Sequence, residues 1–353
     1  MPQRSDTTRF EAASALIQGG RDHQEDAVVT DFPLGSDLGL VVLSDGMGGH
    51  AAGDIASKIV MTEVYSELKF QSTDPAAFAA HLPDILRNAA LSANDCVRAH
   101  IEENPSAYGM GATLVAATLL GDQLNWISVG DSPLYVFRSG ELKQVNEDHS
   151  MAPQIDLMVT SGMMSADAAV NHPDRNALTS VLAGDEIPKI DCPRAGMTLL
   201  HGDIVLAASD GLQFLEDDEI RGVLECDCDK SSATIARHFL AKLDELGDPD
   251  QDNTSLAVIK IEIASADETP VDLNQDALGL EESAWVGYGS ADVSDAGAWQ
   301  TEAAIIDDVA VETLPIRRAV TDQEPADPQV RPRRVVFESD RKSARPKKAK
   351  AKT

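Results

Sequence analysis

The chain has 353 residues, and its 59 acidic residues outnumber 29 basic ones to give a formal net charge of −30 at pH 7. A surface this acidic repels nucleic-acid phosphates and anionic lipid, which argues against a general role on nucleic acid or on a membrane surface. The N-terminus lacks the apolar stretch of a signal peptide, and no run approaches the ~20 apolar residues of a membrane span, so we expect a soluble, cytoplasmic protein.

Apolar runs and helical spacing predict the secondary structure in chain order. Many antiparallel strands with helices grouped in pairs favour an α+β layered domain over a βαβ repeat. A long polar insertion in the second half of the domain is of the kind that is often mobile and functional. The expected elements are a buried strand over 39–44, helices over 54–70 and 84–103, strands over 112–120, 123–129 and 134–138, the polar insertion over 151–184, a buried strand over 203–209, a helix over 232–246 and a closing strand over 255–263.

Charge and periodicity change after Ile263. Residues 264–330 carry fifteen acidic and two basic side chains, whereas residues 331–353 carry ten basic and two acidic ones. This composition buries too little apolar surface to offset the entropy of ordering the chain. We therefore expect one domain over residues 1–263 and a disordered acidic tail over 264–353, whose basic end is solvated rather than bound to an anionic partner.

The cysteines predict no cross-links. Cys96, Cys192, Cys226 and Cys228 are too few and too unevenly spaced for a disulfide framework. Cys226 and Cys228 form a CxC pair, but no second pair of Cys or His residues completes a zinc site. We expect ordinary reduced thiols.

Acidic residues stand at the ends of the predicted buried strands. One such residue is usually a turn residue or a helix cap. Several in one domain favour a cluster, and clustered carboxylates repel one another unless they are protonated or bridged by cations. Oxygen ligands without His or Cys suit Mg²⁺ or Mn²⁺, and two such ions can activate water and neutralise a phosphoryl group. The residues concerned are Asp45, Asp131, Asp210 and Asp252, together with Glu25 and Asp26 after a polar loop.

The motifs around these residues form an ordered series that resembles a known family. The series resembles that of the bacterial PPM (PP2C-type) metal-dependent protein serine/threonine phosphatases over roughly residues 10–262. The insertion resembles the flap region of that family, ending in His172-Pro-Asp-Arg-Asn176. The motifs are Arg21-Asp-His-Gln-Glu25-Asp26, Asp45-Gly-Met-Gly-Gly49, Gly111-Ala-Thr113, Gly130-Asp-Ser132, Asp148-His-Ser150, Ala208-Ser-Asp-Gly211 and Asp252-Asn-Thr-Ser255.

The resemblance implies a four-layer αββα sandwich of two central antiparallel sheets flanked by helix pairs, with a dimetal site for Mn²⁺ or Mg²⁺ at one end. It further implies that a water bridging the two ions attacks phosphorus directly. The implied roles are Asp45 as bridge between two tight ions, the Gly46 carbonyl as a ligand, Asp210 and Asp252 on the first ion, Glu25 near the second, Asp131 on a weaker third ion, Asp26 behind the ligands, and Arg21 on the substrate phosphate.

This chain departs from the family pattern at three of the motif positions. Ala112 replaces the commoner Thr, and Pro133 stands where many members have Arg. Met47 occupies the position of the His that eukaryotic members use as general acid, and a thioether cannot donate a proton. Leaving-group protonation must then come from water or another group, a feature that bacterial relatives share. His50 is separated from the site by glycines, and we assign it no role.

The sequence therefore predicts a phosphatase that hydrolyses phosphoserine and phosphothreonine in proteins. Its expected partners are phosphorylated proteins and a cognate serine/threonine kinase, and we expect a monomer. One alternative is a catalytically silent phosphoprotein-binding module, against which the intact Asp45, Asp210 and Asp252 argue. A second alternative is a regulator of a partner-switching anti-sigma antagonist, which additional sensor or response domains would favour.

Overall fold

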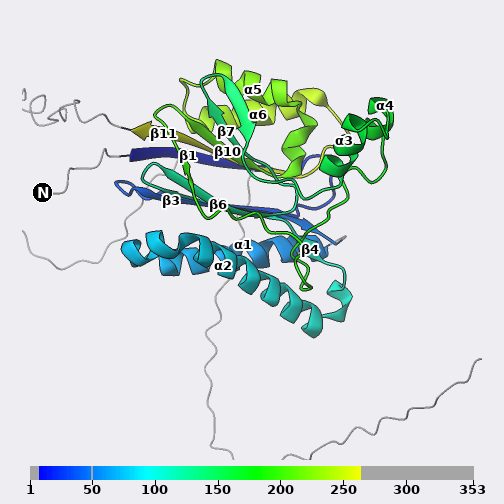
Figure 1. Ribbon diagram of the computed structural model, residues 1–353, viewed down its shortest axis with the longest axis horizontal. Coiled ribbons are helices and arrows are strands. Elements are labelled where there is room, and N and C mark those ends of the chain that lie inside the picture. Colours follow the sequence, from blue (N-terminus) through cyan, green and yellow to red (C-terminus); the bar gives the residue numbers. More distant parts are fainter. Residues whose placement is uncertain (1–7, 49–50, 264–353) are drawn as a thin grey trace, which may run out of the picture. The chain divides into compact units, whose positions relative to one another are not determined.

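The computed structural model describes residues 8–48 and 51–263 as two stacked antiparallel sheets with helices on both outer faces (Figure 1). This confirms the expected α+β fold. His50 and the expected tail over 264–353 lie outside the described residues. One sheet has the order β1 (Thr8–Ile17), β11 (Thr254–Ile263), β10 (Ile204–Ala208), β7 (Leu134–Arg138) and β8 (Glu141–Gln144); the other has the order β2 (Asp26–Asp31), β3 (Leu38–Met47), β5 (Leu114–Leu120), β6 (Gln123–Val129) and β9 (Met197–Thr198), with β4 (Gly111–Ala112) paired to β3.

Strand β3 is buried on both faces because the helices and the second sheet cover it from opposite sides. Val41 packs between the two sheets, with Val205 and Ile259 of the facing sheet in the same cluster. Its neighbours Leu40 and Val42 pack against the helix pair instead. Successive side chains of a strand point to opposite faces, so a strand covered on both faces needs the unbroken apolar run that predicted it.

Helices α1 (Ala51–Gln71) and α2 (Pro75–Glu103) cover the sheet that contains β3 (Figure 1). Helix α2 begins at Pro75, not at residue 84 as predicted. Asp74 caps it, since its side chain accepts a hydrogen bond from the Ala77 amide at 3.1 Å. The predicted helix begins directly after Pro83. Proline normally breaks a helix interior, yet here the helix runs through this residue.

Helices α5 (Asp217–Cys226) and α6 (Ser232–Leu246) cover the other sheet (Figure 1). The bounds of α6 match the prediction, because Ser231 caps its N-terminus and Gly247 ends it with a left-handed φ of 58°. Helix α5 was not predicted, although Glu216 and Glu219 form a capping box at its start. Strands β1, β2 and β8 were not predicted either, since their half-buried residues give no compact apolar run.

The polar insertion folds into α3 (Ala152–Thr160) and α4 (Ala166–Val170), which we call the flap. The flap leaves and returns to the domain at one neck, where the Met151 amide donates to the Ala177 carbonyl at 3.0 Å. The four cysteines are unpaired in the structure. Among the described residues, every helix is too short or too polar to cross a membrane.

Candidate active site

The acidic residues singled out in the sequence meet at one end of the two sheets. Asp26 is the first residue of β2 and stands opposite Asp45 on β3. Asp210 follows β10 and Asp252 precedes β11, and these two strands are neighbours in the facing sheet. Asp131 comes just after β6. Antiparallel pairing thus brings strand ends from distant parts of the chain to a single edge.

The carboxyl groups perturb one another, which shows that they are close. Burial raises the pKa of Asp45 well above its usual range, and the nearby charges of Asp26, Asp210 and Asp131 raise it further. Burial likewise raises the pKa of Asp210, and the charge of Asp252 adds to the shift. A site that crowds like charges in this way favours protons or cations between them.

Burial also raises the pKa of two further carboxyl groups in the cluster, those of Asp26 and Asp131. Burial raises the pKa of Asp26 to about 6, although its Oδ2 accepts a hydrogen bond from Ser209 Oγ at 2.7 Å. Burial raises the pKa of Asp131 to about 7, with contributions from the charges of Asp210 and Asp148. Asp148, the first residue of the motif Asp148-His-Ser150, was not predicted to lie near the site.

Several buried oxygens of the cluster lack a hydrogen-bond partner. They are Asp26 Oδ1, Asp210 Oδ1 and Glu25 Oε1. Buried carboxylate oxygens normally find a donor, because an unpaired one carries the full cost of its lost hydration. Oxygen donors of this kind are the ligands that Mg²⁺ and Mn²⁺ prefer. The residues therefore fit the cofactor that the sequence implied.

Gly53 leaves the space in which two of these oxygen donors approach each other. A Cβ at Gly53 would lie 2.7 Å from Glu25 Oε1 and 2.9 Å from the Gly46 carbonyl oxygen. The backbone holds the pair together, because the Gly46 amide donates to the Glu25 carbonyl at 3.1 Å. Asp54 lies near enough for its charge to raise the pKa of Glu25. Neither Gly53 nor Asp54 was predicted from the sequence.

Within residues 8–48 and 51–263, no three His, Cys, Asp or Glu side chains form a closed metal-ligand set. The carboxyl groups do not surround a metal position completely. The indication of a cation comes from their burial and from the repulsion between their like charges. Such a cluster can draw divalent cations to the end of the sheets and leave room there for a substrate.

Asn253 holds the loop that carries Arg21 and Glu25. Its Oδ1 accepts a hydrogen bond from the Glu25 amide at 2.7 Å, and its Nδ2 donates to the carbonyls of Gln18 at 2.7 Å and His23 at 3.0 Å. The Arg21 guanidinium forms an ion pair with Asp252 while about half of its side chain remains exposed. Arg21 therefore lies beside the cluster and is open to solvent.

A chain of hydroxyl groups links the strand of Asp45 to the turn of Asp131. The Asp45 amide donates to Thr113 Oγ1 at 3.0 Å, and Thr113 Oγ1 lies 2.8 Å from Ser132 Oγ. Thr113 and Ser132 are both buried. The motifs Gly111-Ala-Thr113 and Gly130-Asp-Ser132 thus join the strand of Asp45 to the turn of Asp131 through hydrogen bonds, a contact that their positions in the sequence did not predict. Met47 lies at the rim, with 40% of its surface exposed.

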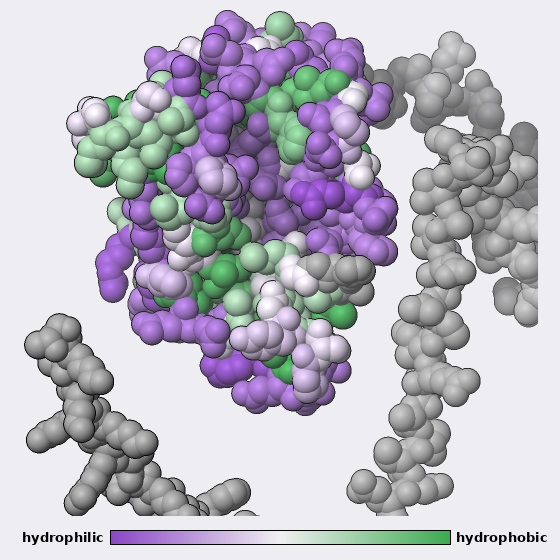
Figure 2. Space-filling view, turned by 90° about the vertical axis from the view of Figure 1, so that its right-hand side faces the viewer, coloured by the Kyte–Doolittle hydropathy of each residue, from purple (hydrophilic) through white to green (hydrophobic). Residues whose placement is uncertain are grey.

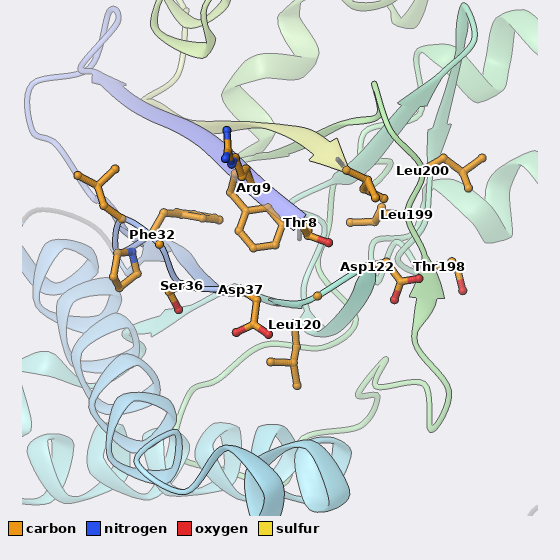
Figure 3. Close-up of a pocket in the computed structure, with 16 residues that line it drawn as sticks. Thr8, Arg9, Phe32, Ser36, Asp37, Leu120, Asp122, Thr198, Leu199 and Leu200 are labelled. Carbon is orange, nitrogen blue, oxygen red and sulfur yellow. The ribbon is translucent and has the colours of Figure 1, made fainter. Parts of the chain in front are cut away.

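The acidic end and the opposite end of the sandwich differ in character. Figure 2 shows a hollow lined by hydrophilic residues between more hydrophobic areas on the face beside the flap. A separate cavity of about 1120 Å³ lies where β1 begins and β11 ends, and it is lined by Phe10, Phe32 and Leu199 (Figure 3). None of the predicted site residues lines that cavity.

The sequence of this chain matches the model of a known protein family. Residues 19–225 match the family model of protein phosphatase 2C. The serine/threonine protein phosphatase PstP of Mycobacterium tuberculosis (strain H37Rv) is 33% identical over 189 residues, which is 51% of this chain and 33% of PstP, so the chain spans about a third of the length of that relative.

Two solved structures extend the similarity to the fold. The serine/threonine phosphatase Stp1 from Staphylococcus aureus is 28% identical with a TM-score of 0.62, and the match covers 74% of this chain and 99% of Stp1. The catalytic domain of PstP in complex with two manganese ions is 27% identical with a TM-score of 0.55, covering 72% of this chain and 100% of that domain.

Proposed function

The chain belongs to the protein phosphatase 2C family, and we propose that it hydrolyses phosphoserine and phosphothreonine in proteins with Mn²⁺ or Mg²⁺ as cofactor. The observation that carries the proposal is the cluster around Asp45, in which burial and neighbouring charges raise the pKa of the carboxyls and three buried carboxyl oxygens lack donors. The related PstP domain, with its two manganese ions, supports a two-metal reading of this cluster.

The proposed ligands are oxygen donors from both sheets. Asp45 would serve both ions, Asp210 and Asp252 would hold the first, and Glu25 would serve the second. The Gly46 carbonyl would be a ligand of one of the two. Asp131 would hold a weaker third ion. Bound there, the cations would activate water and neutralise the charge of the phosphoryl oxygens.

Substrate binding and the positioning of the site would depend on side chains near the cluster. Arg21 would bind the substrate phosphate through its planar guanidinium, which matches two phosphate oxygens at once. Asn253 would orient Arg21 and Glu25 by fixing their loop. Met47 cannot protonate the leaving group, so this proton would come from solvent or from a neighbouring acid.

The substrates of the proposed reaction are phosphorylated proteins, and a serine/threonine kinase must produce them. We also propose that the protein acts as a monomer in the cytoplasm. We assign the phosphatase domain to residues 1–263, because every residue with a proposed role lies there.

Turnover of a phosphothreonine peptide by the metal-treated full-length chain tests the proposal. We expect phosphate release with Mn²⁺, no release in EDTA, and recovery when Mn²⁺ is added in excess of EDTA. Arg21→Ala should raise the KM for the peptide. A folded, Mn²⁺-loaded protein that binds phosphopeptides without releasing phosphate would instead support the silent binding module.

A further inference from the structure

His149 connects the flap to the turn that carries Asp131. Its ring is fully buried, and Nδ1 accepts a hydrogen bond from the Gly130 amide at 3.2 Å. Its backbone amide donates to the Gly130 carbonyl at 3.0 Å. The residue is thus bound to Gly130 through both side chain and backbone, immediately before Asp131.

The other side of His149 holds the neck of the flap. Its carbonyl accepts hydrogen bonds from the Thr179 amide and from Thr179 Oγ1, both at 2.7 Å. The next residue, Ser150, pairs with Leu178 in an isolated bridge. The chain therefore leaves for the flap just after His149, which is bound to Gly130, and returns from it at Leu178 and Thr179, which pair with Ser150 and His149.

The Gly130 turn depends on a partner for its amide. Gly130 has a φ of 106°, and a Cβ there would lie 2.6 Å from Thr113 Cγ2, so the backbone packs directly against Thr113. A buried amide in such a turn needs an acceptor, since an unpaired one is costly. The neutral ring of His149 supplies it, and burial keeps the ring neutral by lowering its pKa.

We infer that His149 is a positioning residue that fixes the Asp131 turn against the neck of the flap. This inference rests on the proposed function, because Asp131 matters only if the site binds metal and turns over substrate. His149 touches no reacting atom in this account. Its effect passes through the Gly130 amide to the carboxylate of Asp131, so it should alter turnover more than substrate binding.

Three variants of the full-length protein separate this role from simple packing. His149→Leu removes the acceptor, whereas His149→Asn retains one, because the Asn Oδ1 occupies a position similar to Nδ1. His201→Leu is the control for loss of an Nδ1 acceptor alone, since the exposed His201 accepts the Ile263 amide at 3.1 Å at the opposite end of the sandwich. We expect His149→Leu to lower kcat roughly ten- to a hundredfold with little change in KM, His149→Asn to recover most of the loss, and His201→Leu to change neither constant.

A double-mutant cycle with Asp131→Asn sharpens the test. If His149 acts through Asp131, adding His149→Leu to Asp131→Asn should lower kcat no further, whereas a general packing defect would multiply the two losses. Multiplying losses, equal impairment by Leu and Asn, or an unchanged kcat in His149→Leu would each overturn the inference.

Two measurements on metal-free protein keep the inference separate from the proposed activity. Amide hydrogen exchange should show loss of protection at Gly130 in His149→Leu and retained protection in the strands. Nitrogen NMR of the wild type should show Nδ1 of His149 unprotonated. A protonated Nδ1 in the wild type, or unchanged exchange at Gly130, would overturn the inference even if no variant were stable enough for kinetics. Confirmed exchange and NMR results without phosphatase turnover would contradict only the proposed function.

Discussion

Asp26 and Asp45 stand directly opposite each other on adjacent antiparallel strands. Side chains of opposed residues lie on the same face of a sheet about 5 Å apart, a distance at which like charges destabilise the pair. Asp26 is only 3% exposed, so solvent screens this repulsion poorly. The register of β2 and β3 therefore builds an unfavourable contact into the fold at the place where a cation would relieve it.

The first prediction concerns a substitution, Asp26→Asn, that removes the repulsion between Asp26 and Asp45. Asp26→Asn keeps an oxygen that can accept the Ser209 hydrogen bond but eliminates one buried charge. At pH 8 in EDTA we expect the free energy of unfolding to rise by roughly 1–3 kcal/mol, while turnover with Mn²⁺ falls. Calorimetric melting and phosphate release on the same preparation measure both. A variant that is less stable than the wild type without metal would contradict the role of repulsion.

The second prediction concerns the support of the Arg21 loop. Asn253→Ala deletes three hydrogen bonds of a buried side chain and leaves the Glu25 amide without its acceptor. We expect a loss of about 2–4 kcal/mol in stability from urea unfolding, and a higher KM for phosphopeptide, because Arg21 is no longer held in place. Ser36→Ala is a suitable control, since its side chain accepts only the nearby Leu38 amide, far from the cluster. Equal effects of the two substitutions would count against the support role.

The third prediction is a pH dependence of stability. Burial lowers the pKa of His149 from 6.5, and the charge of Lys189 adds to this, whereas Glu147, Asp191 and Asp148 oppose it. Above pH 6.5 the ring is neutral in both folded and unfolded chains, so its contribution is complete. As pH falls below 6.5, the unfolded chain binds a proton that the folded chain does not, and stability is lost until the folded pKa is reached.

The difference between wild type and His149→Asn isolates this effect, because all other titrating groups are common to both. From pH 7.5 to 5 in EDTA, the wild type should lose stability faster than the variant, by at most about 1.4 kcal/mol per pH unit. Urea midpoints across this range measure the difference. Parallel curves would show that the folded and unfolded chains protonate His149 alike.

The sequence predicted secondary structure best where a single physical requirement determines the local residue pattern. The unbroken apolar run of β3 and the helical apolar spacing of α6 predicted those elements correctly. The acidic residues at strand ends also met as predicted, since antiparallel pairing brings such ends to shared edges. The start of α2 was wrong, because Pro83 normally ends a helix and only the packed structure shows that it does not.

Other parts of the site depend on contacts between residues far apart in the chain. Nothing near Asn253 in sequence indicates that it binds the carbonyls of Gln18 and His23. The space that Gly53 leaves beside Glu25 is likewise visible only in three dimensions. Periodicity and turn chemistry describe local preferences, whereas these contacts follow from how the two sheets stack.

The fourth prediction concerns the domain boundary. Thr8 and Ile263 form the outermost pair of the β1–β11 ladder within the described residues. A chain shortened to residues 1–264 should keep the melting temperature of the full chain within a few degrees, and its turnover of a small phosphate ester should be unchanged. Differential scanning calorimetry of both lengths measures this. A fall of many degrees would place the boundary beyond residue 264.

The fifth prediction compares Asp45 with Asp131, which a simple turn-residue role would make equivalent. Asp45→Asn should abolish nearly all activity, whereas Asp131→Asn should lower turnover and leave the tight ions in place. A metal bound only by the folded state stabilises it, by ~2.7 kcal/mol at a hundred times the dissociation constant. Added Mn²⁺ should therefore raise the melting temperature of the wild type and of Asp131→Asn, and raise that of Asp45→Asn little.

Calorimetric titration of Mn²⁺ into wild type, Asp45→Asn and Asp131→Asn tests the two-metal site most directly. We expect two tight ions in the wild type and in Asp131→Asn, and loss of much of this binding in Asp45→Asn. Equal stoichiometry and equal affinity in Asp45→Asn and the wild type would contradict the assignment of Asp45 as the bridge between two ions.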